Sequence, residues 1–314
     1  MSETDSEHQI ADELDEARRM FERAQQGRVS PLTRSVPDHV LVVLDGSPQD
    51  EGSIEAGRAM AKRFSTETSV LDARESGDGD LTRSAIEKIE AAKALPRTEG
   101  PAHERILAAA KEVHADIVVV PCPFGRPLDE VGVDSTGTVI DVLLAKSDCS
   151  LLVIRREGFR FMDCLKEIVV IVGGECDAEI HAGEVAAGMS VKEGLIRLNL
   201  VIDREQFENV RDIVETGESD QPLSKEQFAH RLAIAHRKLH GRLEMTATEW
   251  ERRYEMQVID DEQAPPNPLA DPPAMLLVVP LEVDDRYNMG LVKDRIARSP
   301  HPVMVVPTPP KAAE

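Results

Sequence analysis

The chain has 314 residues, which favours two compact domains at roughly 100 to 200 residues per domain. Acidic residues outnumber basic residues by 58 to 37, and the resulting net charge of −21 argues against binding to the phosphate backbone of nucleic acids. Only 3% of the residues are aromatic, which removes the stacking surfaces that single-strand binders and many sugar or flavin sites use. We therefore expect an acidic globular protein with no nucleic-acid partner.

The longest apolar runs, at residues 275–281 and 168–172, are far shorter than the roughly 20 residues that span a bilayer. The first seven residues carry acids where a signal peptide would carry positive charge. The sequence thus predicts a cytoplasmic protein without membrane insertion. Its four cysteines have no close pairing and are interpreted as reduced, buried thiols.

In chain order, the first predicted element is an amphipathic helix at residues 6–27. Ser6 and Gln9 fit a capping box, and apolar residues recur at helical spacing up to Phe21 and beyond. We expect this apolar stripe to pack on a domain of the same or a neighbouring chain. Residues 28–37 contain two X-Pro steps and are interpreted as a linker, so residues 1–36 form a separate N-terminal region.

Strands and helices then alternate twice. In the first half, strands are predicted at 40–44, 69–73, 117–120 and 151–154, and helices at 54–64, 81–94, 102–114 and 135–145. In the second half, strands are predicted at 167–172, 195–202, 275–279 and 303–306, and helices at 178–189, 225–239 and 288–297. Continuous apolar strands alternating with helices indicate α/β domains with parallel, doubly covered sheets.

The two halves are similar to each other at their ends, where CSLLVIR corresponds to HPVMVVP and IVVVPCP to MLLVVPL. A repeat of this size is a duplicated domain. We place domain 1 at residues 37–157 and domain 2 at residues 158–314.

Several motifs of the first half together resemble the universal stress protein family. They are VVLDGS at 42–47, GPA at 100–102, ILAAA at 106–110 and ADIVV at 115–119. The resemblance implies two doubly wound, five-stranded, Rossmann-like parallel-sheet domains in tandem, preceded by the N-terminal helix. It extends over nearly everything after Pro37.

The resemblance also implies a nucleotide site in domain 1. In nucleotide-binding members the aspartate after the first strand faces the adenine, and a glycine-rich loop after the fourth strand carries the phosphates. The matching residues here are Asp45, Gly125, Gly137 and Thr138, which would bind ATP or AMP. Glycines let backbone N–H groups approach phosphate at a helix N-terminus, so the chemistry is sound.

The loop departs from the family pattern, however. Phe124 and Pro127 stand where the first two glycines belong, and Gly125 is one residue out of register. Acids at positions 129, 130 and 134 would repel a triphosphate unless a divalent metal intervened.

Domain 2 departs further. Gly173-Gly174-Glu175 replaces Asp45-Gly46-Ser47, and the short loop at 280–285 offers no phosphate cradle. We interpret domain 2 as a degenerate structural or regulatory copy.

Other chemical patterns favour structural roles. His236 and His240 lie four residues apart on a predicted helix, but no third metal ligand is apparent and both are interpreted as surface residues. The same helix carries five basic residues between 225 and 242, which would serve either as a docking face or as internal ion-pair partners.

Two further groups are assigned no chemistry. The hydroxyls Ser135, Thr136 and Thr138 fit a helix cap. Cys122 lies at the ligand-side edge of the sheet without a histidine near it in sequence, so we predict no catalytic thiol. The sequence has no Gly-x-Ser-x-Gly elbow, no phosphate-binding P-loop and no pair of motif-placed acids, so we predict no enzyme activity and no metal site.

The leading hypothesis is a non-enzymatic, universal-stress-type regulatory scaffold without a cofactor, which binds itself and an unidentified protein partner. The alternative is a stress sensor that binds ATP or AMP in domain 1 alone. Both halves end in short apolar strands, at 151–154 and 303–306, which would otherwise be exposed sheet edges. We expect these strands to pair antiparallel, either within one chain as a pseudo-dimer or between two chains as a homodimer.

Overall fold

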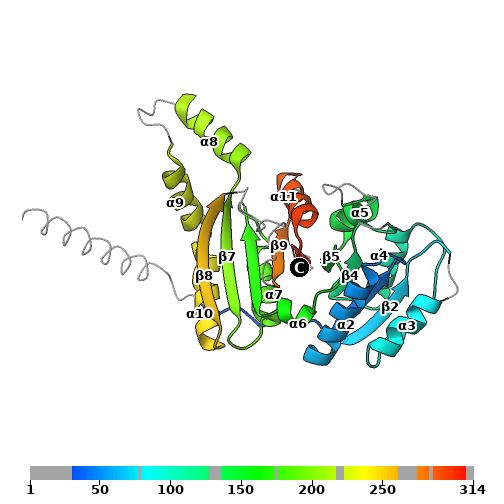
Figure 1. Ribbon diagram of the computed structural model, residues 1–314. Coiled ribbons are helices and arrows are strands. Elements are labelled where there is room, and N and C mark those ends of the chain that lie inside the picture. The colour runs from blue at the N-terminus through cyan, green and yellow to red at the C-terminus, as the bar shows by residue number, and fades with distance from the viewer. Residues whose placement is uncertain are drawn as a thin grey trace, which may run out of the picture.

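The computed structural model describes residues 30–76, 79–126, 136–173, 176–216, 223–260, 274–282 and 286–308. The helix expected at 6–27 lies outside these residues, and so do Ser135 and the acids of the loop at 127–135. Elements are labelled as in Figure 1.

The first half alternates strands with helices after an irregular lead-in. Its elements are β1 (His39–Leu44), α2 (Asp50–Phe64), β2 (Glu67–Asp72), α3 (Asp80–Lys88), β3 (Lys93–Ala94), α4 (Ala102–Glu112), β4 (Ile117–Pro121), α5 (Thr138–Lys146) and β5 (Ser150–Ile154). The short helix α6 (Phe161–Cys164) leads into the second half.

The second half follows the same order of strands, with three helices between its second and third strands where the first half has one, and with no helix among the described residues between its third and fourth strands. Its elements are β6 (Glu167–Val172), α7 (Glu179–Met189), β7 (Leu195–Ile202), α8 (Arg204–Thr216), α9 (Lys225–Ala235), α10 (Arg237–Glu249), β8 (Arg253–Asp260), β9 (Leu276–Leu281), α11 (Arg286–Arg298) and β10 (Val303–Pro307). Helices α8 and α9 extend beyond the end of the sheet (Figure 1).

All ten strands form one sheet, in the order β3-β2-β1-β4-β5-β10-β9-β6-β7-β8. Neighbouring strands are parallel except β5 and β10, which pair antiparallel with Val303 opposite Val153 and Val305 opposite Leu151. Each half therefore has the same strand order, related by an approximate twofold axis between the two central strands. The expected α/β fold and the expected pairing of the terminal strands within one chain are confirmed. The boundary drawn between residues 157 and 158 stays a prediction.

The sheet separates two hydrophobic cores, and each core extends across both halves. Side chains alternate along the buried strands, so Val42 contributes to one core and Val43 to the other. Helices α2 and α7 cover the first core, whereas α4, α5 and α11 cover the second. Each fully buried Val or Leu contributes roughly 1.5–3 kcal/mol, so this shared burial holds the halves together.

Four elements were not expected from the sequence: β3, α6, α8 and β8. The single helix expected at 225–239 is two helices, α9 and α10, which meet at His236. The remaining strands and helices lie where they were predicted, with shifts of a few residues at their ends.

The described part of the expected linker, residues 30–37, has no regular structure but is packed against the second half. Leu32 is 3% exposed, and its N–H donates to the Thr246 hydroxyl of α10 at 2.7 Å. Arg242 of α10 donates to the carbonyls of Ser30 and Pro31. We call residues 30–37 the strap, because they connect the first strand of one half to the helices of the other.

In the part of the chain that the structure describes, no helix is long and apolar enough to span a bilayer.

Candidate functional site

The turn between β1 and α2 is held by a carboxyl group from the start of the helix. Asp50 accepts the backbone N–H groups of Asp45, at 3.0 Å, and Gly46, at 2.8 Å. Gly46 has a φ of +84°, a conformation that favours glycine. The DGS sequence thus forms a tight turn with Asp45 at the carboxyl end of the strand.

Asp45 and Gly125, which the sequence placed in one site, are in direct contact. The Oδ2 atom of Asp45 accepts the Gly125 N–H at 2.5 Å, and its Oδ1 atom accepts the Ser47 N–H at 2.8 Å. The Asp45 side chain is buried, with only 7% of the residue exposed. The two oxygens of the carboxylate therefore accept hydrogen bonds from the loop after β4 and from the turn after β1.

Asp50 shares its electrostatic environment with Asp45. The pKa of Asp50 is raised to about 7, mainly by burial and also by the nearby Asp45 charge, while the two backbone N–H groups act in the opposite direction. Two carboxyl groups so close together do not both ionise readily. Asp50 therefore retains its proton into the neutral range.

Gly137 and Thr138 lie at the N-terminus of α5 and line a cavity that Asp45 and Gly125 do not line. Thr136, Gly137, Thr138 and Asp141 line one side of it, and Lys293, Asp294 and Ala297 of α11 line the other, around a volume of about 490 Å³. The Lys293 ammonium lies 3.1 Å from the Asp141 carboxylate. The second half therefore contributes to the place where the first half would bind phosphate, which the sequence did not indicate.

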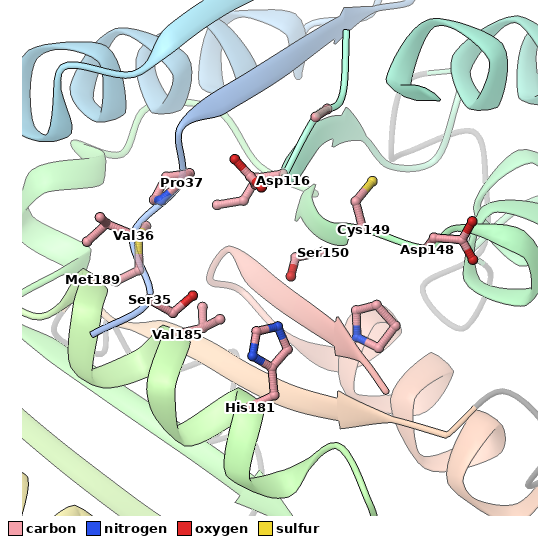
Figure 2. Close-up of a pocket in the computed structure, with 13 residues that line it drawn as sticks. Ser35, Val36, Pro37, Asp116, Asp148, Cys149, Ser150, His181, Val185 and Met189 are labelled. Carbon is pink, nitrogen blue, oxygen red and sulfur yellow. The ribbon is translucent and has the colours of Figure 1, made fainter. Parts of the chain in front are cut away.

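A second cavity, of about 190 Å³, lies between the two halves at the amino ends of β1, β4 and β5. Figure 2 shows the strap residues Ser35, Val36 and Pro37 on one side of it, with Asp116 and Cys149 nearby. Val185 of α7 lies beside Ser35, and His181 of the same helix forms the lower wall in this view. Sequence analysis did not identify this cavity, because its walls come from segments that are far apart in the chain.

Two solved structures are similar to this chain over most of its length. A protein of unknown function from Pseudomonas aeruginosa PAO1 matches 87% of this chain and 93% of its own, with a TM-score of 0.56 and 13% identity. A universal stress protein from Archaeoglobus fulgidus DSM 4304 matches 86% of this chain and 98% of its own, with a TM-score of 0.55 and 13% identity. The chain has the universal stress protein fold. No protein-family model and no curated protein matches the sequence.

Within the universal stress protein fold, the turn after β6 corresponds to the Asp45 turn. Gly173 stands at its start, and a Cβ atom there would lie 2.8 Å from the Leu291 side chain of α11. After β9, Asn288 closes the short loop by accepting the Glu282 N–H at 2.8 Å. Among the described residues, apolar packing thus surrounds the start of the turn after β6, and a side-chain cap holds the end of β9. The degenerate character of the second half stays a prediction.

Cys122 lies at the carboxyl edge of β4 but is not an activated nucleophile. Its Sγ atom contacts the Thr136 carbonyl at 3.5 Å and the Arg155 guanidinium at 3.6 Å. Burial raises the pKa of this thiol to about 11, although the Arg155 charge acts in the opposite direction. The thiol therefore stays protonated at neutral pH. All four cysteines are free, and three of them are buried.

The expectation that His236 is a surface residue is wrong. His236 is 1% exposed, and its Nδ1 atom lies 2.5 Å from the Glu179 carboxylate. His240 is partly buried, and its Nδ1 atom lies 2.8 Å from the Tyr254 hydroxyl. The two imidazoles bond to different partners, and no cluster of three or more metal-ligating side chains occurs among the described residues.

The basic helix expected at 225–242 is partly neutralised by acids of the same chain. Lys225 lies 2.6 Å from Asp260, and Arg242 lies 3.7 Å from Glu184. For these two residues the structure supports internal ion pairing, the alternative to a docking face.

Proposed function

We propose that this chain is a non-catalytic regulatory scaffold of the universal stress type, which acts by binding a protein partner. The observation that supports it is the Asp45 carboxylate, whose two oxygens accept N–H groups of Gly125 and Ser47. In this arrangement the carboxylate closes the edge of the sheet instead of being presented to a base. The packing of Leu291 against Gly173 and the Asn288 cap on Glu282, in the second half, favour the same function.

A second candidate is a nucleotide-responsive first half, and the cavity at Gly137 and Thr138 favours it. This cavity lies at the N-terminus of α5, where backbone N–H groups attract phosphate, and Lys293 adds a cation from α11. In this candidate Asp45 would release Gly125 when the nucleotide binds.

Calorimetric titration of the full chain with ATP and with AMP, each with and without Mg²⁺, distinguishes the two candidates. The scaffold proposal predicts no saturable binding. Saturable micromolar binding that is weakened both in Asp45→Ala and in Thr138→Val would overturn it in favour of the nucleotide sensor. Arg58→Gln, on the exposed side of α2, is the control for general effects of charge.

A further inference from the structure

The carbonyl end of α7 is a meeting point for arginines from both halves of the molecule. Ser190 is the residue that ends this helix. Arg63, near the end of α2, donates to the Ser190 carbonyl at 2.8 Å. Arg252, just before β8, donates to the Ser190 hydroxyl at 2.8 Å and to its carbonyl at 3.3 Å. Two guanidinium groups from distant parts of the chain thus converge on a single residue.

A third arginine, Arg34, approaches the same place from the strap. The strap is fixed beside it, since the Ser35 carbonyl packs directly against Gly188 of α7. Burial and the neighbouring Arg34 charge lower the pKa of Arg63. Burial and the charges of Arg63 and Arg34 lower the pKa of Arg252, although the Glu251 charge acts in the opposite direction. The three guanidinium groups are therefore close enough to repel one another.

Within the described residues, no carboxylate forms an ion pair with Arg34, Arg63 or Arg252. Glu251, the acid adjacent to Arg252 in the chain, is held by Lys192 at 2.6 Å. The Nε atom of Arg63 is buried and has no hydrogen-bond partner in this part of the structure. Elsewhere in this acidic molecule arginines are neutralised, as Arg197 is by Glu167 at 2.7 Å and Glu255 at 3.2 Å.

Capping of the α7 dipole does not account for such a cluster. One cation at a helix C-terminus stabilises the helix, and each further cation adds repulsion from the first. Three neighbouring cations without an ion pair among the described residues, in a chain with a net charge of −21, indicate a place where a negative charge is to be bound. Guanidinium forks are well suited to the oxygens of phosphate.

We propose that Arg34, Arg63 and Arg252 form a binding site for a small phosphate-type oxyanion at the junction of the strap and the two halves. The bound anion would neutralise the mutual repulsion of the arginines. Because the three residues come from the strap, from α2 and from the approach to β8, binding would also strengthen the contact between the halves.

Inorganic phosphate is the probe, titrated into the full chain by calorimetry and in thermal unfolding. Chloride balances the ionic strength throughout, because screening alone stabilises a strongly acidic protein. We expect saturable binding and a rise in melting temperature above that of the chloride reference. Arg63→Gln and Arg252→Gln should each weaken binding about tenfold or more, as expected for the loss of a charge-assisted hydrogen bond.

Two control variants locate the effect. Arg58→Gln removes a cation of α2 that pairs with Glu55 and should leave phosphate binding unchanged. Thr138→Val alters the α5 cavity, so unchanged phosphate binding in this variant separates the arginine site from the nucleotide candidate. The proposal is overturned if phosphate acts no differently from chloride, or if Arg63→Gln and Arg252→Gln bind phosphate as tightly as the parent chain.

Discussion

Asp50 is the buried acid that organises the ligand-side edge of the first half. It holds the turn that presents Asp45, and Asp45 in turn holds Gly125 of the following loop. The geometry of this edge therefore depends on two carboxyl groups that share one restricted space. The protonation of Asp50 is coupled to stability, because a carboxyl group whose pKa is raised by folding favours the folded state only while it is protonated.

The first prediction of pH dependence concerns Asp50. Its pKa of about 7 in the folded protein lies above the ordinary value of 3.8, so the folded state binds the proton more tightly. The stabilisation is fully present below about pH 4 and is lost as the pH rises through about 7. Denaturant unfolding between pH 4.5 and 7.5, a window set by these two values, should show a steeper loss of stability in the parent than in Asp50→Asn. Equal slopes in the two proteins would contradict the prediction.

His301 has the opposite effect in an overlapping range of pH. Burial, followed by the Arg156 charge, lowers the pKa of this histidine to about 4, so protons bind preferentially to the unfolded chain. This contribution increases stability as the pH rises from about 4 to 6.5. The test therefore compares how steeply the free energy of unfolding changes with pH in the parent and in Asp50→Asn. The His301 contribution is present in both proteins and cancels in this difference.

At the level of residues, the sequence identified the participants in the candidate site better than it identified their contacts. The DGS turn after an apolar run marked Asp45, and the glycine-containing loop marked Gly125. Their hydrogen bond joins residues that are 80 positions apart, so it depends on the packing of two loops and not on local pattern. The contribution of Lys293 was missed for the same reason.

Among the elements, α7 makes the closest contact with the strap. Gly188 lies on the face of α7 that meets the Ser35 carbonyl, and a Cβ atom built at position 188 would lie 1.9 Å from that oxygen. The lack of a side chain at Gly188 is thus what allows the strap to lie flat on the helix.

Gly188→Ala is therefore expected to destabilise the protein although alanine is the better helix former. The strap must move away, and overpacking of this kind costs typically 1–3 kcal/mol, more than the gain of about 1 kcal/mol in helix propensity. Denaturant unfolding measures the loss, and trypsin should cleave faster after the exposed Arg34.

The matched control is Gly290→Ala in α11, where an added Cβ meets nothing within 4 Å. It should be neutral or stabilising by up to about 1 kcal/mol. If the two variants had the same stability, the close approach of the strap would not be the determinant.

Two of the departures from the sequence prediction, strand β8 and the break between α9 and α10, have separate physical explanations. Strand β8 is an edge strand with charged or polar side chains at alternate positions, including Arg253, Glu255 and Gln257, so it lacks the continuous apolar run of the inner strands. The break between α9 and α10 at His236 coincides with the contact of that imidazole with Glu179 of α7. Tertiary contacts of this kind override local helix propensity.

Strands β5 and β10 mark the boundary between the two halves of the sheet, and their antiparallel pairing joins the halves. Because β5 and β10 run antiparallel, each half protects the edge that the other would otherwise expose. The result is a single sheet whose free edges are the two-residue β3 and the polar β8.

Val305→Pro tests whether this central pairing joins the halves. Val305 lies opposite Leu151 on β5 and beside Val279 on β9, so proline removes a ladder donor inside the sheet. We expect a loss of stability of at least about 1–3 kcal/mol, from one buried partner left unsatisfied. The contact between the halves should also be lost. A lower yield of the zero-length crosslink between Lys293 and Asp141, which lie 3.1 Å apart, would measure this loss.

Val305→Ala is the control for this experiment, because it keeps the backbone N–H while removing two methyl groups. It should be less stable than the parent but retain the crosslink between the halves. A proline variant that formed the crosslink in full yield and melted like the parent would show that the strand pairing is dispensable.

The central position of β10 has a consequence for how the molecule is made. During synthesis β5 is complete at Ile154, whereas its antiparallel neighbour begins only at Val303. At rates of about 5–20 residues per second, the first half waits on the order of ten seconds with its β5 edge open. Over that interval the negative charge of one nascent chain repels other nascent chains on the same polysome. This repulsion protects the open edge of β5 from pairing with a second copy.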